Sequence, residues 1–392
     1  MTFPTVTITQ LNQRQGRINE VERTVLFIGS AAADSDTPGD LIALDSQSDI
    51  TVVLADADIY LRENVRAAQR NGGQNWQAYA IILTVDAQPG DDMLAIMSAQ
   101  QMLSVEGIVC TIPITDVNTG RTKIQLYAAL RAELANKYGR WAWSMLTVAG
   151  PKEQKELLTE MTWSAYLAFL AELETGIAAE SVQLVPALWG NEAGVLAGRL
   201  CNRSVTVADS PARVKTGALI GLGIDSADMP VDSNGVEVTL AHLRALHDLR
   251  YSVPMWYPDY EGMYWADGRT LDVKGGDFQK IENVRIVDKA SRRVRIQAIA
   301  KIADRSMNST PGSIAAHQTY FARTLRDMSH SFQINGETFP GEVKSPQTGD
   351  VVITWSDSET VSIYIVVRPY GSAKTIQVGI MLDESITAIT GN

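Results

Sequence analysis

Thr24-Val25-Leu26-Phe27-Ile28-Gly29 is a continuous apolar run, which is typical of a strand buried on both faces of a sheet. From this run to about Leu188, short apolar runs alternate with longer amphipathic segments. Further strands are predicted at 50–54, 79–85, 107–112, 141–148 and 182–185. Helices are predicted at 56–73, 91–104, 122–137 and 151–174. Repeated β–α units of this length predict a mainly parallel sheet that is covered by helices.

The first 24 residues do not look like part of a core. Thr5-Val6-Thr7-Ile8-Thr9 alternates polar and apolar side chains as a strand does, and a polar connector follows from Gln10 to Arg23. This strand could pair within its own fold, or it could add to the edge of a sheet in another subunit. At ~3.3 Å per residue, about twenty extended residues span ~65 Å, which is enough to reach a neighbour.

Beyond residue 190 the pattern changes. Helices are predicted to dominate 191–250, with a loop at 225–234, and the aromatic-rich segment 256–271 predicts a hairpin. Helices at 278–304 and 311–332 are followed by strand patterns at 351–355, 361–368 and 375–382. The predicted fold class is mixed α/β, with a β-containing C-terminal assembly domain and extended arms at both ends. The predicted parts are an N-terminal arm (1–24), an α/β domain (25–190), a helical and β C-terminal domain (191–382) and a C-terminal tail or arm (383–392).

Composition excludes several classes of function. The chain has 392 residues, 45% of them hydrophobic, and a formal net charge of −11, which argues against general nucleic-acid binding. There is no run of ~18 apolar residues for a membrane span, and the first residues lack the pattern of a signal peptide, so synthesis in the cytoplasm is expected. Cys110 and Cys201 are too few for a disulfide framework and are expected to be buried free thiols.

Motifs for cofactor chemistry are incomplete. Gly29-Ser30-Ala31-Ala32-Ala33 follows a strand but leads into acidic residues, which would repel a phosphate, and Gly221-Leu222-Gly223 is only a fragment of a dinucleotide fingerprint. His242 and His247 are five residues apart, so they do not share one helix face as metal ligands do. We therefore predict no cofactor, no metal and no catalytic residues, and we do not expect an enzyme.

The segment from Lys274 to Arg305 is basic, with nine Lys or Arg residues against four Asp or Glu residues. It could be a solvated helix face with local ion pairs. It could also be a basic stripe that docks on an acidic surface of a partner or of another copy.

Several short motifs in the last third of the chain resemble the contractile tail sheath family of myophage-type tails and related contractile injection systems. The resemblance extends from about Trp256 to Leu382. It rests on an aromatic loop that closes in a Gly-Arg-Thr-Leu turn, an Asn-Val-Arg helix start and two closing strand motifs. The four stretches are Tyr264–Leu271, Ile281–Arg285, Ile363–Pro369 and Ile376–Ile380.

The resemblance implies a virion structural protein. Such subunits stack as hexameric rings around a tail tube, exchange terminal arms that complete a small sheet in a neighbour, and contract without consuming nucleotide to drive the tube through the host envelope for genome ejection. Implied partners are further copies of the chain, the tail tube protein, and baseplate and tail terminator proteins, without direct nucleic-acid contact or membrane insertion. Assembly would take place in the bacterial host cytoplasm. The alternatives are another tail or baseplate component, or an α/β nucleotide-dependent enzyme, which would need a convergent polar site.

Three sets of candidate site residues follow from the resemblance and the strand patterns. The predicted inter-subunit arm strands contain Thr5, Val6, Thr7, Ile8, Thr9, Ile376, Val378, Ile380 and Ile386. The predicted acceptor sheet contains Val361, Ile363, Ile365 and Val367. The candidate tube-facing basic residues are Arg285, Lys289, Arg292, Arg293 and Arg295.

Overall fold

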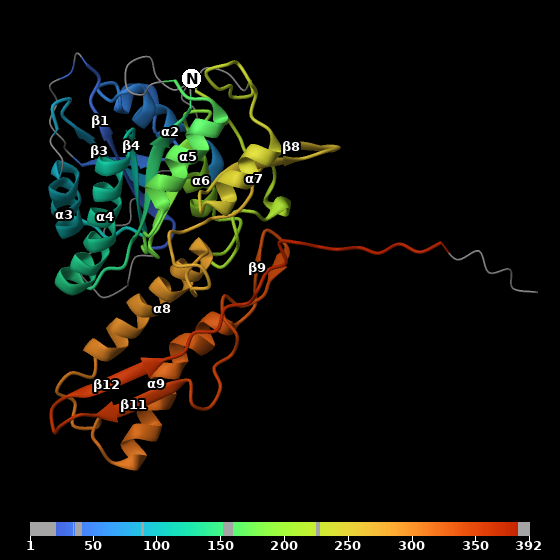
Figure 1. Cartoon of the computed structure of the whole chain (residues 1–392). Coiled ribbons are helices and arrows are strands. Elements are labelled where there is room, and N and C mark those ends of the chain that lie inside the picture. The colour runs from blue at the N-terminus through green and yellow to red at the C-terminus, as the bar shows by residue number, and fades with distance from the viewer. Residues whose placement is uncertain are drawn as a thin grey trace, which may run out of the picture.

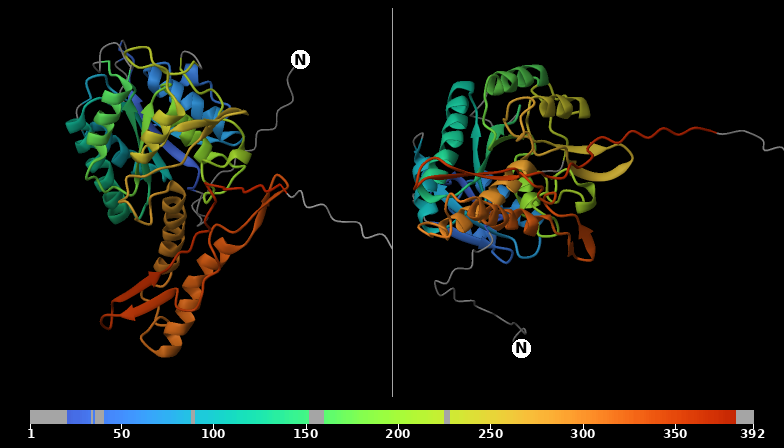
Figure 2. Two further views of the ribbon diagram at one scale, coloured as in Figure 1. Left: turned by 45° about the vertical axis from the view of Figure 1, so that its right-hand side comes forward. Right: turned by 90° about the horizontal axis from the view of Figure 1, so that it is seen from below.

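A helix-covered sheet body, residues 21–272, carries an elongated C-terminal module, residues 281–370, which extends from one side of it (Figure 1). The computed structural model describes residues 21–33, 35, 41–87, 90–151, 160–224 and 228–382. Residues 375–382, the C-terminal arm, run away from both parts (Figures 1 and 2).

The sheet of the body has six strands in the order β2-β3-β1-β4-β5-β6. Its members are β1 (Thr24–Ser30), β2 (Ile42–Asp45), β3 (Gln77–Leu83), β4 (Gly107–Ile114), β5 (Trp143–Ala149) and β6 (Val182–Ala187). The central strand β1 pairs in parallel with both β3 and β4, and only the edge strand β2 runs antiparallel. The predicted mixed α/β class with a mainly parallel sheet is therefore confirmed.

Helices cover both faces of this sheet, and β1 contributes apolar side chains to the core on each face. Val25 and Phe27 pack into the core beneath α2 (Ile59–Gly72) and α6 (Glu192–Cys201). Leu26 and Ile28 pack into the opposite core. The helices over that core are α3 (Asp91–Met102), α4 (Val117–Tyr138), α5 (Trp163–Glu174) and α7 (Leu240–Asp248).

Helix α6 lies against α2 at backbone contact distance. A side-chain carbon at Gly194 would collide with the carbonyl oxygen of Asn64, and one at Gly198 would collide with the backbone of Ala68. The Asn64 side chain also accepts a 2.6 Å hydrogen bond from the Gly194 N–H. The glycines thus serve close helix packing rather than a turn.

Two local predictions were wrong or incomplete. The apolar run 50–54 is not a strand but the short helix α1 (Ile50–Val53), which Asp49 caps by accepting a 3.0 Å hydrogen bond from the Thr51 N–H. Short apolar runs do not distinguish strand from helix by periodicity, and the edge strand β2 comes from the preceding residues instead. In the predicted helix 151–174, the described helix α5 begins only at Trp163, after its cap Thr162, and residues 152–159 lie outside the described residues.

The predicted aromatic hairpin is present as β7 (Pro254–Tyr257) and β8 (Tyr260–Trp265), which pair antiparallel. Trp265 is fully buried in the same core as α2 and α6. Between α6 and α7 the chain is irregular apart from the short 3-10 turn η1 (Val214–Thr216), so helices do not dominate 191–250. Residues 191–272 thus pack with the sheet body, although the sequence grouped them with the C-terminal domain.

Two long helices form the frame of the C-terminal module, and small hairpins complete it. Helices α8 (Ile281–Ile299) and α9 (Pro311–Ser329) pack on each other. The hairpins are β9 (Phe332–Ile334) with β10 (Glu337–Phe339), and β11 (Val351–Trp355) with β12 (Val361–Ile365). Phe321 of α9 packs on Val351 and Ile353 of β11, so the second hairpin covers α9.

The predicted last strand, 375–382, is not a strand in the isolated chain. These residues make no strand pairing, and Ile376, Val378 and Ile380 are 78%, 76% and 92% exposed. A strand needs a partner for its backbone hydrogen bonds, and the described part of the chain supplies none for this segment. The predicted strand 361–368 is shorter than expected and ends at Ile365.

Candidate functional site

The hairpin of β11 and β12 carries the predicted acceptor residues. Val361, Ile363 and Ile365 are half-buried against the small core around Phe321, and Val367 packs in the neighbouring core of the module. Among the described residues, β11 and β12 pair only with each other, so each has an outer edge without a strand. Because two-stranded sheets are marginal in water, such edges favour the addition of further strands.

The C-terminal arm is fixed at its root by Lys374. Its ammonium group contacts the Asp267 carboxylate and donates a 2.9 Å hydrogen bond to Glu282 Oε1. Both carboxylates are buried. Burial acts to raise the pKa of Asp267, but the His247 imidazole, 4.0 Å away, and the Lys374 ammonium outweigh it and hold the pKa at about 2. The arm therefore leaves the body from a defined point.

The chain that follows the N-terminal arm is also fixed. Thr5–Thr9 and Ile386 of the predicted arm strands lie outside the described residues. Glu22, which lies at the end of the connector after the predicted N-terminal arm strand, forms a 2.9 Å ion pair with Arg292 of α8. Since Glu282 belongs to α8 as well, one helix holds the roots of both arms.

Three of the five predicted tube-facing residues are buried instead. Arg285 is 1% exposed and pairs with Glu106 at 2.5 Å, while Lys289 pairs with Glu342 at 2.7 Å. With Arg292 they occupy positions i, i+4 and i+7, and so one face of α8. That face points into the protein, which makes the tube-facing prediction wrong for Arg285, Lys289 and Arg292. Arg293 is half-buried. Arg295 is exposed, and it lies beside Arg292 on the helix because the two are three residues apart.

The electrostatics of Glu106 explain why this charge tolerates burial. Burial acts to raise its pKa, but the adjacent Arg285 guanidinium outweighs this and holds the pKa below its usual value of 4.5. The Arg285 guanidinium also donates a 2.8 Å hydrogen bond to the carbonyl of Leu200. The pair therefore links α8, α6 and the loop before β4.

The two glycine stretches and the two cysteines noted in the sequence are packed within the fold. Gly29 packs directly against Leu61 and Thr111 side chains, and the Gly223 N–H donates to Asn191 Oδ1 at 2.8 Å. Cys110 and Cys201 are buried free thiols, as predicted. In the described ranges, no group of three or more His, Cys, Asp or Glu residues could hold a metal ion. Nor does any helix there have the length and apolar character to cross a membrane.

Comparison with known proteins covers nearly the whole chain. Two family models match, described as DUF2586, N-terminal domain (residues 3–269) and DUF2586, C-terminal domain (residues 277–385). A protein of Haemophilus phage HP1 (strain HP1c1), described as a tail sheath protein, is 48% identical over 381 residues, which cover 97% of this chain and 98% of the relative. The chain belongs to the tail sheath family. The two family models meet where the sheet body passes into α8.

Solved sheath structures share this fold at low sequence identity. The sheath complex of the PVC extracellular contractile injection system, in the contracted state, has a TM-score of 0.60 and 15% identity over 98% of both chains. The contracted helical sheath of the anti-feeding prophage has a TM-score of 0.58 and 15% identity over 98% of this chain and 100% of that chain. A sheath tail protein from Desulfitobacterium hafniense has a TM-score of 0.52 and 11% identity over 92% and 96%. The tail sheath fold therefore extends through both parts of the chain.

Sequence reasoning missed the residues that anchor the arms in this sheath protein. Lys374, Asp267 and Glu22 were not singled out, because each looks like an ordinary charged residue in its local sequence. One signal was available for Glu106, an isolated carboxylate directly before the apolar strand Gly107–Ile114. Such a charge at the start of a buried strand indicates an ion pair, although not its partner.

Proposed function

We propose that the chain is the sheath subunit of a contractile phage tail. It polymerises as stacked hexameric rings around the tail tube and contracts to drive the tube through the host envelope. The observation that carries the proposal is the match between an exposed apolar arm with a fixed root and a hairpin whose strand edges are unpaired. An arm that finds no partner in its own chain fits an edge in a neighbouring copy.

Strand addition accounts for how such subunits stay linked while they move. The arm alternates apolar and polar residues through Ile376, Val378 and Ile380, so one face would be buried when it pairs with a neighbour's β11–β12 hairpin. Pairing of the main chain leaves the connector free to change direction. The sheet body and the C-terminal module could then rotate as one unit during contraction, because buried ion pairs of α8 join them.

Other parts of the assembly would occupy other surfaces. We assign the domains as an N-terminal arm, a sheet body that extends to about residue 272, a C-terminal module and a C-terminal arm. Arg293 remains the proposed contact with the tail tube, while Arg295 lines a separate cavity. Baseplate and terminator proteins would bind the two ends of the polymer, which would be built in the bacterial host cytoplasm and become part of the virion tail.

Removing the arms tests this proposal. Deletion of residues 1–20, and separately of residues 375–392, should leave a folded subunit that no longer forms striated cylinders, because neighbours lose their shared strands. Circular dichroism would report folding, and negative-stain electron microscopy would report assembly. Cylinders formed normally by both truncated proteins would contradict strand exchange.

A matched pair of variants separates apolar burial from arm length. Replacing Ile376, Val378 and Ile380 with Ser should abolish cylinders, since the face that enters the acceptor hairpin becomes polar. Replacing Thr375, Gln377 and Met381 with Ser, on the alternate face, should leave most assembly intact. Equal loss in both variants would argue against a paired strand.

A second structural role has one specific observation in its favour. A chain in the structure of the anti-feeding prophage baseplate has a TM-score of 0.57 and 14% identity over 98% of this chain. A role at the baseplate predicts single rings that do not grow, and the same micrographs would distinguish rings from cylinders.

A further inference from the structure

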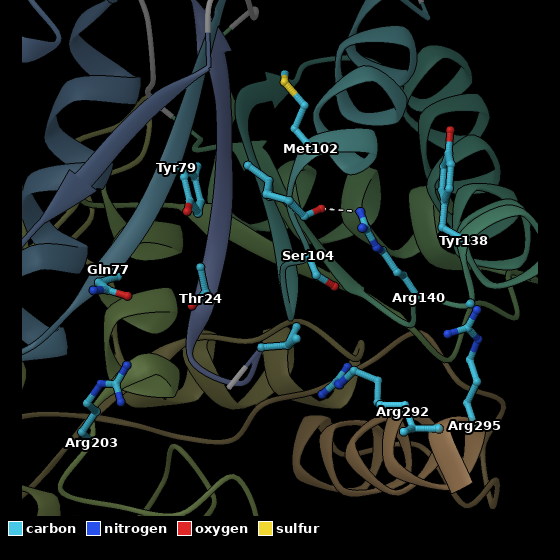
Figure 3. Close-up of a pocket in the computed structure, with 14 residues that line it drawn as sticks. Thr24, Gln77, Tyr79, Met102, Ser104, Tyr138, Arg140, Arg203, Arg292 and Arg295 are labelled. Carbon is cyan, nitrogen blue, oxygen red and sulfur yellow. Dashed lines mark hydrogen bonds between the residues drawn. The ribbon is translucent and has the colours of Figure 1, made fainter. Parts of the chain in front are cut away.

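A cavity of about 930 Å³ lies between the sheet body and the second half of α8. The lining comes from the starts of β1 and β3, the ends of α3 and α4, and α8, and in Figure 3 Arg292 and Arg295 rise from α8 toward the sheet body. Its lining includes Arg140, Arg203, Arg292 and Arg295, and no carboxylate from the part of the chain that the structure describes. This volume is within the range of about 300–1,000 Å³ that is typical of binding pockets.

Within the described residues, the charges of Arg140 and Arg295 in this cavity are not paired with a carboxylate. Arg292 is neutralised by Glu22. Arg140 donates instead to neutral oxygens, the carbonyl of Leu103 and the side chain of Gln100. Burial lowers the pKa of Arg140; Tyr138 opposes this in part, and the nearby Arg295 charge adds a smaller lowering effect. Two guanidinium groups that repel each other across a cavity favour the binding of an anionic group between them.

Apolar side chains adjoin these arginines. Met102, at the end of α3, is 73% exposed, and Ile296 of α8 is 40% exposed, and both line the cavity. Tyr138 also lines it and lies 5.7 Å from the Arg140 guanidinium. Arg, Tyr and Met are enriched in the buried centres of protein interfaces, so this composition favours a protein segment over a small anion.

The tip of the β7–β8 hairpin has the complementary chemistry. Tyr260 is 56% exposed, and Asp259 and Glu261 beside it are also exposed. The ring of Tyr260 lies 5.6 Å from that of Tyr264 and 6.4 Å from that of Tyr257, so the tip is a stiff aromatic cluster. The tip is held to the body by the Leu219 N–H, which donates a 2.8 Å hydrogen bond to the Met263 carbonyl. A rigid aromatic group loses little entropy on docking.

Tip and cavity lie on different sides of the molecule. The hairpin projects beside α7, away from the ends of α3 and α4 (Figures 1 and 2), whereas the cavity is lined by the ends of α3 and α4 and by α8. The tip therefore does not fill the cavity of its own chain. Two complementary surfaces on separate sides of one chain produce head-to-tail contacts, which generate rings or helices.

We propose that the β7–β8 tip of one subunit inserts into the arginine-lined cavity of a second copy of the chain. Tyr260 would pack on Met102 and Ile296, and the Glu261 carboxylate would lie between Arg140 and Arg295. This contact rests on the proposed polymerisation, but it is separate from the exchange of arms. It assigns a binding role to the aromatic hairpin and to Arg295.

Charge exchange tests the contact. Glu261→Lys and Arg295→Glu should each cause loss of cylinders in negative-stain micrographs, and the combined variant should restore them, because the ion pair is re-formed with opposite sign. Asp259 is left unchanged, since its φ of 61° disfavours most other residues. Glu172→Lys, at an exposed position of α5, and Arg323→Glu, at an exposed position of α9, are matched controls that should assemble normally.

Disulfide trapping gives a second, independent measurement. A mixture of Glu261→Cys and Arg295→Cys proteins, oxidised after assembly, should give a covalent dimer that neither protein gives alone. Cys110 and Cys201 should not interfere, because both are buried. If wild-type protein forms cylinders but the mixture gives no dimer, or the charge-exchange variant is not restored, the contact is wrong while the proposed function stands. If wild-type protein never polymerises under any condition, the proposed function itself fails.

Discussion

Buried ion pairs join the sheet body to helix α8 of the C-terminal module. Glu106 and Arg285 are both almost completely buried, and they are separated by 179 positions in the sequence. Arg292 and Glu22 are 270 positions apart. A buried pair contributes little net stability, but the removal of one partner leaves an unpaired charge in a low-dielectric interior.

Arg285→Met should therefore lower the free energy of unfolding by about 3–5 kcal/mol, because Glu106 would remain buried without its cation. Urea unfolding followed by circular dichroism would measure the loss. Arg323→Met is the matched control, since Arg323 and Asp327 are exposed and their contact is 3.8 Å long. It should change stability by no more than about 1 kcal/mol. Similar losses in the two variants would contradict the role of the buried pair.

The same pair predicts a pH dependence with a definite sign. The pKa of Glu106 is lower in the folded protein than its usual value of 4.5, so its charge stabilises the fold above that value. This contribution should be lost progressively as the pH falls below about 4.5. In Glu106→Gln, stability should fall less steeply over that acidic range than in the wild-type protein.

At the scale of elements, helix packing and strand pairing followed different rules. The contact of α6 with α2 depends on Gly194 and Gly198, and no charge or motif marks these positions. Strands with partners formed where the apolar pattern predicted them, as in β4 and β5. The pattern at 375–382 did not form a strand, because the described part of the chain offers it no strand to pair with. Alternation thus reports which face a segment can bury, and pairing depends on what is available to pair with.

Gly194→Ala should destabilise the protein by about 1–3 kcal/mol, because the new methyl group would overlap the Asn64 carbonyl and separate the two helices. Thermal or urea unfolding would measure the change. Gly312→Ala in α9 is the matched control, because a side-chain carbon there meets no atom within 4 Å. It should be neutral or stabilise by up to about 1 kcal/mol. A neutral Gly194→Ala would show that α6 can shift without loss.

At the scale of the whole molecule, α8 belongs to two cores at once. Ile281 and Val284 pack into the core of the sheet body, while Ile286 and Ala290 pack in the C-terminal module. The same helix holds the root of each arm through Arg292 and Glu282. A pull on either arm would therefore act first on α8, which is the structural element common to both parts.

This arrangement predicts where the chain can be shortened. A fragment that ends at residue 272 should aggregate or unfold at low denaturant, because it exposes the α8 site and leaves Glu106 unpaired. A fragment that ends at residue 300 retains α8 and should unfold in one cooperative transition. Size-exclusion chromatography and urea unfolding would compare them. Equal stability of the two fragments would mean that α8 belongs to the module alone.

The sequence alone determined the features that depend on neighbouring residues: the parallel α/β pattern, the aromatic hairpin and the resemblance to sheath proteins. Local geometry governs these features, since side chains repeat every two residues in a strand and about every 3.6 in a helix. Only the tertiary structure decided that the basic face of α8 points inward, that Lys374 fixes the arm, and that tip and cavity lie on different sides. Those facts depend on which distant residues meet, and contacts across 100 or more positions are set by the packing of the whole chain, which no local pattern encodes.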